Sequence, residues 1–279
     1  MKIDFHVHVT PPEIITNWEK IAKKEKYFSL LSRNPHNKYA TAEDVITALD
    51  SSQFDRAVVF GFAFKDLGLC RLVNDYVIEK TRQFPDRLTG FMSVSPNVKG
   101  LEKEIERCHD AGLCGIGELY PDGQGVNIDN EKETRTLAGA CLERSLPLML
   151  HTNEPVGHFY IGKNNIALQK IERFIENNQE LRVILAHWGG GLFFYESMPE
   201  LRKKFRNVFY DTAASPFLYD SRVYNAAKAL GLCQKIIFGS DFPLLPPSRY
   251  FSALEESGLS PEDKQLILGG NALQLTGNS

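Results

Sequence analysis

Short apolar runs alternate with amphipathic stretches from one end of the chain to the other. The short runs are rich in valine, isoleucine, leucine and phenylalanine and are bounded by polar or turn-forming residues, which is typical of buried β-strands. We predict eight strands: Lys2–His8, Arg56–Phe62, Leu88–Ser95, Cys114–Tyr120, Pro147–Thr152, Arg182–Trp188, Val208–Ala213 and Lys235–Asp241.

The stretches between the strands have the periodicity of helices that bury one face. We predict helices over Ala42–Ser52, Cys70–Gln83, Leu101–Ala111, Glu131–Arg144, Asn165–Asn177, Pro199–Phe205, Ser221–Leu230 and Ser248–Glu256. Thr41, followed by Asp44, is suited to cap a helix start. Gly112 and Gly231 each follow a helical run, where a left-handed residue ends the helix.

Regular alternation of strands and helices predicts βαβ units and a parallel sheet. Eight such units favour a single-domain α/β fold, a (β/α)8 TIM barrel spanning residues 1–279. Two segments lie outside the repeat: an extended first connection, Pro11–Ala40, and a tail, Ser260–Leu275, that we predict to be an extra C-terminal helix. No GxGxxG follows the first strand, so a dinucleotide-binding fold is not indicated.

Composition narrows the class of protein without identifying it. The 279 residues are 43% hydrophobic and 24% charged, with a formal charge of −3, so nucleic acid is not an expected partner. No window is apolar enough to cross a membrane, and no signal peptide is apparent. Five cysteines without a CxxC pair favour core positions in a reducing compartment, so we expect a cytoplasmic protein. The sequence is compatible with a homo-oligomer.

The residues of greatest chemical interest stand at the ends of predicted strands. They are His6 and His8 in KIDFHVH, His151 in LPLMLHT, His187 in VILAHW and Asp241 in IIFGSDFP. In a parallel barrel the carboxyl ends of all strands surround one pocket. These side chains are therefore expected to meet, although their positions in the sequence are far apart.

The first strand carries two of these histidines at alternate positions, which places them on one face. The same alternation predicts that Ile3, Phe5, Val7 and Val9 face the helices, while Asp4, His6 and His8 point into the barrel. Polar groups inside a barrel need partners, and a metal ion would supply them.

Three imidazoles and one carboxylate, from His6, His8, His151 and Asp241, suit Zn²⁺ and also accept Fe²⁺, Mn²⁺ or Co²⁺. His187 is expected either to ligate a second ion or to act as an acid, a base or an oxyanion stabiliser. Glu118, in GIGELY, either bridges two ions or holds other groups in position by hydrogen bonds. One ion and two ions thus both stay open. Asp211 is expected to be a hydrogen-bond acceptor.

The ordered motifs HVH, LHT, AHWGG, GSDFP and ILGGNALQL resemble the amidohydrolase superfamily, in particular its amidohydrolase-related (amidohydrolase 2) branch. That branch includes decarboxylases similar to aminocarboxymuconate semialdehyde decarboxylase, and lactonases. The resemblance implies a single metal held by His6, His8, His151 and Asp241, with His187 as a catalytic base or acid. The GIGE strand departs from that pattern and is similar to TatD-type hydrolases, in which a glutamate joins a two-metal site.

The function expected first is metal-dependent hydrolysis of a C–N or C–O bond, as in an amide, lactone or ester of a small molecule. A metal-activated water would attack, Asp241 would transfer its proton, and His187 would stabilise the oxyanion. The first alternative is non-oxidative decarboxylation of a small unsaturated or aromatic acid, and the second is a TatD-like two-metal nuclease.

The substrate is expected to be bound by the loop that follows His151. Its residues Glu154, His158 and Lys163 are candidates to contact the substrate, the last two through a carboxylate or phosphate. Arg33 and Arg249 lie in connections from which they could reach the pocket and bind an anion.

Overall fold

The computed structural model describes residues 1–33, 38–164 and 167–277, and over these residues the chain forms eight strands joined by helices. The strands are β1 (Ile3–His8), β2 (Arg56–Phe60), β3 (Leu88–Gly90), β4 (Ile116–Leu119), β5 (Leu148–Leu150), β6 (Val183–Leu185), β7 (Val208–Asp211) and β8 (Ile236–Ile237). All eight predicted strands are present. Each is shorter than predicted, and in all except β1 the last predicted residues lie in the loop that follows the strand.

The strands pair in chain order and in parallel, as two sheets of order β1-β2-β3 and β4-β5-β6-β7-β8. Two seams join the sheets. At one, Met92 bridges Ile116; at the other, Val7 bridges Phe242. The second seam is extended by a hydrogen bond from Phe5 N to Phe238 O of 2.8 Å. The ring is therefore closed, and the predicted (β/α)8 barrel is confirmed.

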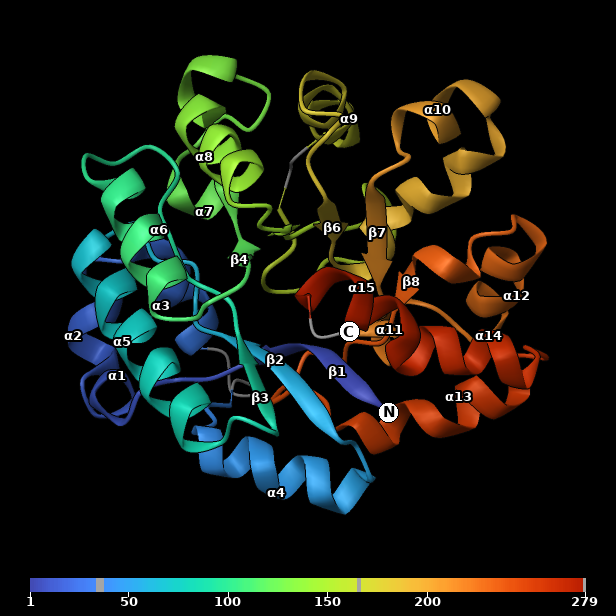
Figure 1. Ribbon diagram of the computed structural model, residues 1–279, viewed down its shortest axis with the longest axis horizontal. Helices are drawn as coiled ribbons and strands as arrows, with labels where there is room; N and C mark the ends of the chain where they lie inside the picture. The colour runs from blue at the N-terminus through green and yellow to red at the C-terminus, as the bar shows by residue number, and fades with distance from the viewer. Residues whose placement is uncertain (34–37, 165–166, 278–279) are drawn as a thin grey trace.

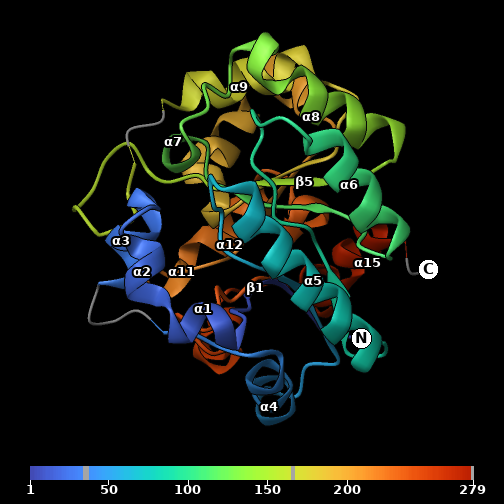
Figure 2. The ribbon, with the colours of Figure 1, turned by 90° about the vertical axis from the view of Figure 1, so that its left-hand side faces the viewer.

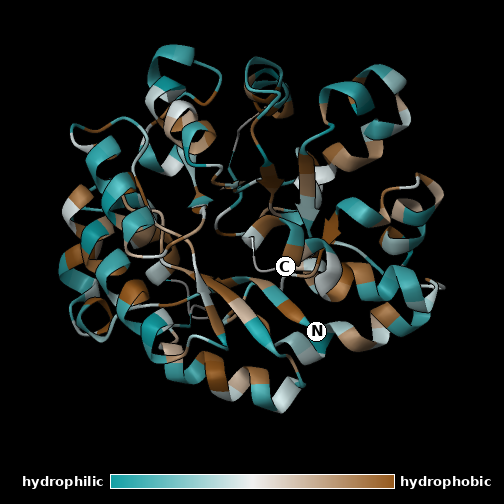
Figure 3. Cartoon of the chain, viewed as in Figure 1, coloured by the Kyte–Doolittle hydropathy of each residue, from teal (hydrophilic) through white to brown (hydrophobic). Residues whose placement is uncertain are grey.

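Helices surround this ring (Figure 1) and turn polar faces outward (Figure 3). They are α1 (Pro12–Thr16), α2 (Trp18–Ala22), α3 (Lys26–Ser32), α4 (Ala42–Ser52), α5 (Leu67–Gln83), α6 (Leu101–Asp110), α7 (Pro121–Gln124), α8 (Glu131–Glu143), α9 (Leu168–Asn177), α10 (Pro199–Lys204), α11 (Ser215–Leu218), α12 (Arg222–Ala229), α13 (Phe251–Glu256), α14 (Pro261–Gln265) and α15 (Asn271–Thr276). Short helical segments are η1 (His187–Ser197), η2 (Cys233–Lys235), η3 (Pro247–Tyr250) and η4 (Leu266–Gly270).

The predicted helix boundaries are confirmed most closely where a capping residue fixes them. Thr41 and Asp44 form a capping box at the start of α4, and Gly112 and Gly231 have φ of 104° and 66°. The predicted helix over Ser248–Glu256 is instead split into η3 and α13. The predicted helix start at Asn165 lies outside the described residues.

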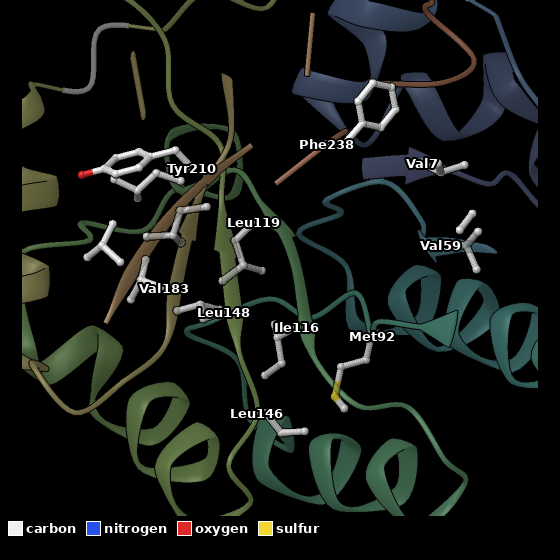
Figure 4. Packing of buried hydrophobic residues seen from close by; sticks show 14 of the residues in the cluster. Val7, Val59, Met92, Ile116, Leu119, Leu146, Leu148, Val183, Tyr210 and Phe238 are labelled. Carbon is white, nitrogen blue, oxygen red and sulfur yellow. The ribbon is translucent and has the colours of Figure 1, made fainter. Parts of the chain in front are cut away.

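Apolar side chains form two layers. The outer layer, between strands and helices, includes Val7, Val59, Leu148 and Val183 (Figure 4). The inner layer fills the barrel with Ile3, Phe5, Val58, Phe60, Phe91, Met149, Ile184 and Ile237.

The predicted alternation along β1 is wrong at its beginning. Ile3 and Phe5 belong to the inner layer, whereas Val7 and Val9 belong to the outer layer as predicted. The cause is an irregularity in the register of β1 against β2 between Asp4 and Val7, which changes the face that successive side chains occupy. Asp4 is buried and accepts hydrogen bonds from the backbone and hydroxyl of Ser240 (2.9 and 2.5 Å).

The two segments outside the βα repeat lie at different places on the barrel. Ala272 and Leu275 of α15 join the inner layer, so the tail closes the barrel near its N-terminal end, where Figure 1 shows α15 over the ring. The first connection forms α1, α2 and α3, which lie together at the side of the barrel (Figure 2).

Five free cysteines are present, four of them buried and Cys114 half-buried, as predicted for core positions. Within the described residues no helix has the length and apolar character needed to span a bilayer.

Candidate metal centre

Four donor atoms meet above the inner layer at the C-terminal end of β1. His6 Nε2 lies 3.2 Å from His8 Nε2. Asp241 Oδ1, supplied by the loop after β8, lies 3.6 Å from His6 Nε2 and 3.4 Å from His8 Nε2. Glu118 Oε2, from β4, is 3.7 Å from each of the same two nitrogens. The structure thus joins side chains from β1, β4 and the end of β8 into one cluster.

The second oxygen of Glu118 faces the other two histidines. Its Oε1 accepts a hydrogen bond from His151 Nδ1 at 2.9 Å and lies 3.5 Å from His187 Nε2. One carboxylate therefore contacts all four imidazoles of the site. The sequence indicated Glu118 only as one of several candidates. Nothing in the GIGE motif predicted its central position among the histidines.

The donor set fits a divalent cation. Four donors about 2.1 Å from a tetrahedral ion lie about 3.4 Å apart, and the five separations given above, which run from 3.2 to 3.7 Å, lie around this value. His8 Nδ1 and His151 Nε2 are buried without a hydrogen-bond partner among the described residues, so polar capacity remains for a ligand. Within the part of the chain that the structure describes, the donor groups compact enough for one ion are His6 with His8 and Asp241, and His6 with Glu118 and His187. Neither group includes His151.

Hydrogen bonds on the far sides of two rings determine which nitrogen faces the cluster. His6 Nδ1 donates to Asp211 Oδ2 at 2.8 Å, and His187 Nδ1 donates to the carbonyl of Ala213 at 3.1 Å. Each bond places the Nδ1 proton away from the site and leaves Nε2 directed into it, the arrangement usual for a metal-binding imidazole. The predicted role of Asp211 as a hydrogen-bond acceptor is confirmed, because its Oδ1 also accepts from His187 N and Ala213 N.

Two of the site residues have left-handed backbones. Asp241 has φ of 62° and His187 has φ of 56°, values that are uncommon outside glycine and concentrate at functional positions. His187 opens the η1 segment, where Trp188 and three glycines continue with positive φ. Gly190 is required there, because a Cβ atom would lie 2.4 Å from the carbonyl oxygen of Asn153.

The buried carboxylates of the site are stabilised by positive charge beside them. Burial disfavours protonated His6, but Asp211 and Glu118 outweigh it and raise the pKa of His6 to about 9. Burial also opposes protonation of His187, yet its hydrogen bond to Glu118 and the charge of Asp241 raise its pKa to about 10. Burial favours neutral Glu118, but His151 and His6 hold its pKa well below the usual range. Protons or a cation supply this charge.

A cavity of about 820 Å³ opens above the cluster, with His8, Glu118, His151, His187 and Asp241 in its wall. Aromatic rings make up much of the rest of that wall: Tyr27, Phe28, Tyr39, Phe62, Tyr120, Tyr160 and Phe217.

Tyr27 of α3 stacks on Tyr120 with ring centroids 3.6 Å apart, and Tyr120 in turn contacts the His151 ring at 4.7 Å. Sequence reasoning missed both tyrosines as site residues. The available signals were the aromatic content of the first connection for Tyr27 and, for Tyr120, its place at the end of the GIGELY motif.

The predicted substrate loop is only partly in the cavity wall. His158 lines the cavity, whereas Glu154 and Lys163 are not among its described lining residues. Lys163 Nζ donates to the carbonyls of Val156 and His158 at 2.5 and 3.2 Å. Glu154 accepts a hydrogen bond from the Tyr160 hydroxyl at 3.3 Å.

Of the two arginines considered from the sequence, Arg249 lines the cavity, and Arg33 is not among the described lining residues. Lys38, which sequence reasoning did not single out, also lines it.

Comparison with known proteins gives a consistent match over the chain. A family model described as amidohydrolase matches residues 3–277. No curated protein matches the sequence.

Solved structures resemble the chain over 99% of its length. One is 5-carboxyvanillate decarboxylase from Sphingomonas paucimobilis, with a TM-score of 0.79, 15% identity and 98% of that chain covered. Another is 2,6-dihydroxybenzoate decarboxylase from Rhizobium, with a TM-score of 0.73, 18% identity and 98% covered. A third is a dihydroxybenzoic acid decarboxylase from Polaromonas with bound manganese and the inhibitor 2-nitroresorcinol, with a TM-score of 0.76, 17% identity and 96% covered. At these identities the likeness establishes the fold.

Proposed function

The chain belongs to the amidohydrolase family, and from that premise we propose that it is a metal-dependent, non-oxidative decarboxylase of a small aromatic or unsaturated carboxylic acid. The similar structures from Sphingomonas, Rhizobium and Polaromonas are decarboxylases, which favours this reaction over the hydrolysis expected first from the sequence. The five unpaired cysteines support a reducing, cytoplasmic setting.

One observation carries the proposal: a set of side chains suited to a divalent cation lies at an aromatic-lined cavity. Rings such as Phe62, Tyr120 and Phe217 in the wall match a flat, unsaturated substrate better than a flexible amide, because aromatic groups pack face to face or edge to face. The cavity volume of about 820 Å³ is within the range usual for small-molecule sites.

His6, His8, Asp241 and Glu118 would hold the cation, with His151 adjacent through its bond to Glu118. A divalent ion supplies Lewis acidity and holds and orients an anionic substrate. The nitrogen and carboxylate donors accept zinc, manganese, iron or cobalt. We would test manganese first, because the Polaromonas structure contains it. The second oxygen of Glu118 lies between His151 and His187, where it could bind a second ion. The proposal therefore includes both one ion and two ions.

The remaining groups move the proton that decarboxylation requires. The carbon that bears the carboxylate gains a proton, the C–C bond to the carboxylate breaks, and its electron pair returns to the substrate as CO₂ leaves. His187 is the donor we propose, because its Nδ1 is engaged by Ala213 and its Nε2 faces the cavity beside Glu118. The aromatic wall excludes water from the same carbon.

Hydrolysis is the second candidate. Asp241 favours it, because this carboxylate lines the cavity next to His8, where it can accept a proton from an attacking water.

The two reactions are separated by their products. We would load the full chain with Mn²⁺ and supply hydroxybenzoates and unsaturated diacids on one side, and aryl amides, esters and lactones on the other. Release of CO₂ from an acid, with one proton incorporated on carbon, is the expected result. Release of amine or alcohol without any CO₂ would replace this proposal by hydrolysis.

Asp241→Asn provides the matched inactive control. Asparagine tolerates the left-handed backbone of position 241, so the fold should persist while the rate falls by about 10²–10⁴-fold. Full activity of this variant with metal bound would show that the site does not need the Asp241 carboxylate.

A further inference from the structure

We propose that Lys38 and Arg249 form an anion-binding subsite in the cavity wall, which binds a second negatively charged group of the substrate. The inference rests on the proposed function for the site at the donor cluster and names the substrate class: an aromatic or unsaturated acid that carries two anionic groups, such as a dicarboxylate.

Both cations lie on the side of the cavity where β8 meets β1. Thr10, two residues beyond β1, donates its backbone N–H to Ala40 O at 2.7 Å, which places the segment containing Lys38 beside the end of β1. Arg249 lies in η3, which is held by a 2.7 Å hydrogen bond from Tyr250 Oη to Ser240 O. Helix α4, which follows Lys38, packs against η3. Two separate connections thus bring a cation to one part of the wall.

Neither cation has an ion pair with an acid among the residues that the structure describes, whereas many other lysines and arginines do. Arg87, Arg107, Lys80 and Lys235 each lie within 3.0 Å of a carboxylate oxygen. The acids described in the cavity wall are Glu118 and Asp241, and both belong to the donor cluster. The positive charges of Lys38 and Arg249 are therefore available to a ligand.

The two ends of the cavity differ in depth and charge. His151 and His187, which line the cavity beside the donor cluster, are buried, whereas Lys38 and Arg249 are exposed, which places the cations nearer the mouth. A guanidinium and an ammonium recognise a carboxylate strongly, the guanidinium through two parallel hydrogen bonds. A dianion can therefore place one group at the donors and the other at these cations.

The charge of the first connection agrees with an anionic ligand. Residues 11–40 contain five lysines and one arginine against three glutamates, although the whole chain has a formal charge of −3. Of these cations Lys38 is the one among the described lining residues of the cavity, and a net positive connection beside the opening attracts anions toward it.

The test compares two probes that differ by one carboxylate, benzoate and isophthalate. Their binding to the full, Mn²⁺-loaded chain would be measured by calorimetry, which needs no turnover. We expect isophthalate to bind about tenfold more tightly than benzoate or better, because hydrogen bonds between charged groups are strong. Arg249→Gln and Lys38→Gln should each reduce this preference and leave benzoate binding unchanged.

Arg82→Gln and Lys103→Gln are the matched controls, since both residues are exposed and neither is among the described lining residues of the cavity. They should retain the wild-type preference. An equal affinity of the wild type for the two probes, no binding of isophthalate, or a preference that survives both cavity substitutions would overturn the subsite. Because binding alone is measured, absence of CO₂ release would contradict the proposed reaction without affecting this result.

Discussion

At the residue scale, the centre can bind a cation through a histidine only if the ring nitrogen that faces the site carries no proton. Asp211 is fully buried and uses one oxygen for His6 Nδ1 and the other for two backbone N–H groups. It therefore fixes both the orientation of the His6 ring and the position of its proton.

Asp211→Asn should lower the affinity for Mn²⁺ by about 10–100-fold. The amide oxygen can still accept the two backbone bonds, but the amide nitrogen then faces His6 Nδ1 and cannot accept its proton. His6 is expected to move its proton to Nε2 and lose the lone pair that faces the site. Competition with a chelator measures the affinity, and Asp110→Asn, an exposed aspartate on α6, should change nothing. Unaltered binding by Asp211→Asn would show that this hydrogen bond does not control the ring.

Residue types at strand ends predicted which side chains meet, but not how they meet. His6, His8, His187 and Asp241 come together as the barrel requires. The position of Glu118 between the imidazoles, and the hydrogen bond that turns His151 Nδ1 toward it, depend on distances of a few tenths of an ångström that no pattern of residue types contains. The same holds for Lys38, because an exposed lysine in a long connection has no distinctive sequence signal.

At the element scale, the loops after the strands are as closely fitted as the strands themselves. In η1, positive φ values continue from His187 through Gly191, and Gly190 packs directly on the backbone of the loop after β5. The turn that presents His187 and the turn that follows His151 therefore support one another.

Gly190→Ala should destabilise the protein by about 2–3 kcal/mol and reduce activity, because a Cβ atom meets the Asn153 carbonyl and the backbone is left-handed. Gly139→Ala is the control. Gly139 lies within α8, and a Cβ atom there would meet no atom of the described residues within 4 Å, so alanine should stabilise by about 0.5–1 kcal/mol. Urea unfolding measures both. Equal stability of the two variants would show that the loops are not in close contact in solution.

The patterns of apolar residues predicted the elements well and their detailed geometry less well. Capped helices such as α4 match the prediction because their ends are set by hydrogen bonds between residues no more than four positions apart in the sequence. The interchange of faces within β1 was not predictable, because a change of register in one strand reflects its pairing with β2 rather than its own sequence.

At the scale of the whole molecule, the donors come from segments distributed around the ring. A cation that binds only the closed barrel stabilises it by mass action. Mn²⁺ at one hundred times its dissociation constant should raise the free energy of unfolding by about 2.7 kcal/mol relative to protein in chelator.

Thermal or urea unfolding with and without Mn²⁺ checks this value. Asp241→Asn should show a smaller increase, since it lacks one charged donor. Identical unfolding curves for the wild type in Mn²⁺ and in chelator would mean that the native state holds no such site.

Closure of the ring at β1 and β8 also has a kinetic consequence. Asp4 and Ser240 are 236 positions apart yet share hydrogen bonds, and His6 and Asp241 lie beside them. Contacts between such distant segments form late in folding, because the intervening loop must first be ordered. Uptake of the cation during refolding would therefore report the moment at which the two ends of the sheet join, and would distinguish that step from the earlier collapse of the individual βα units.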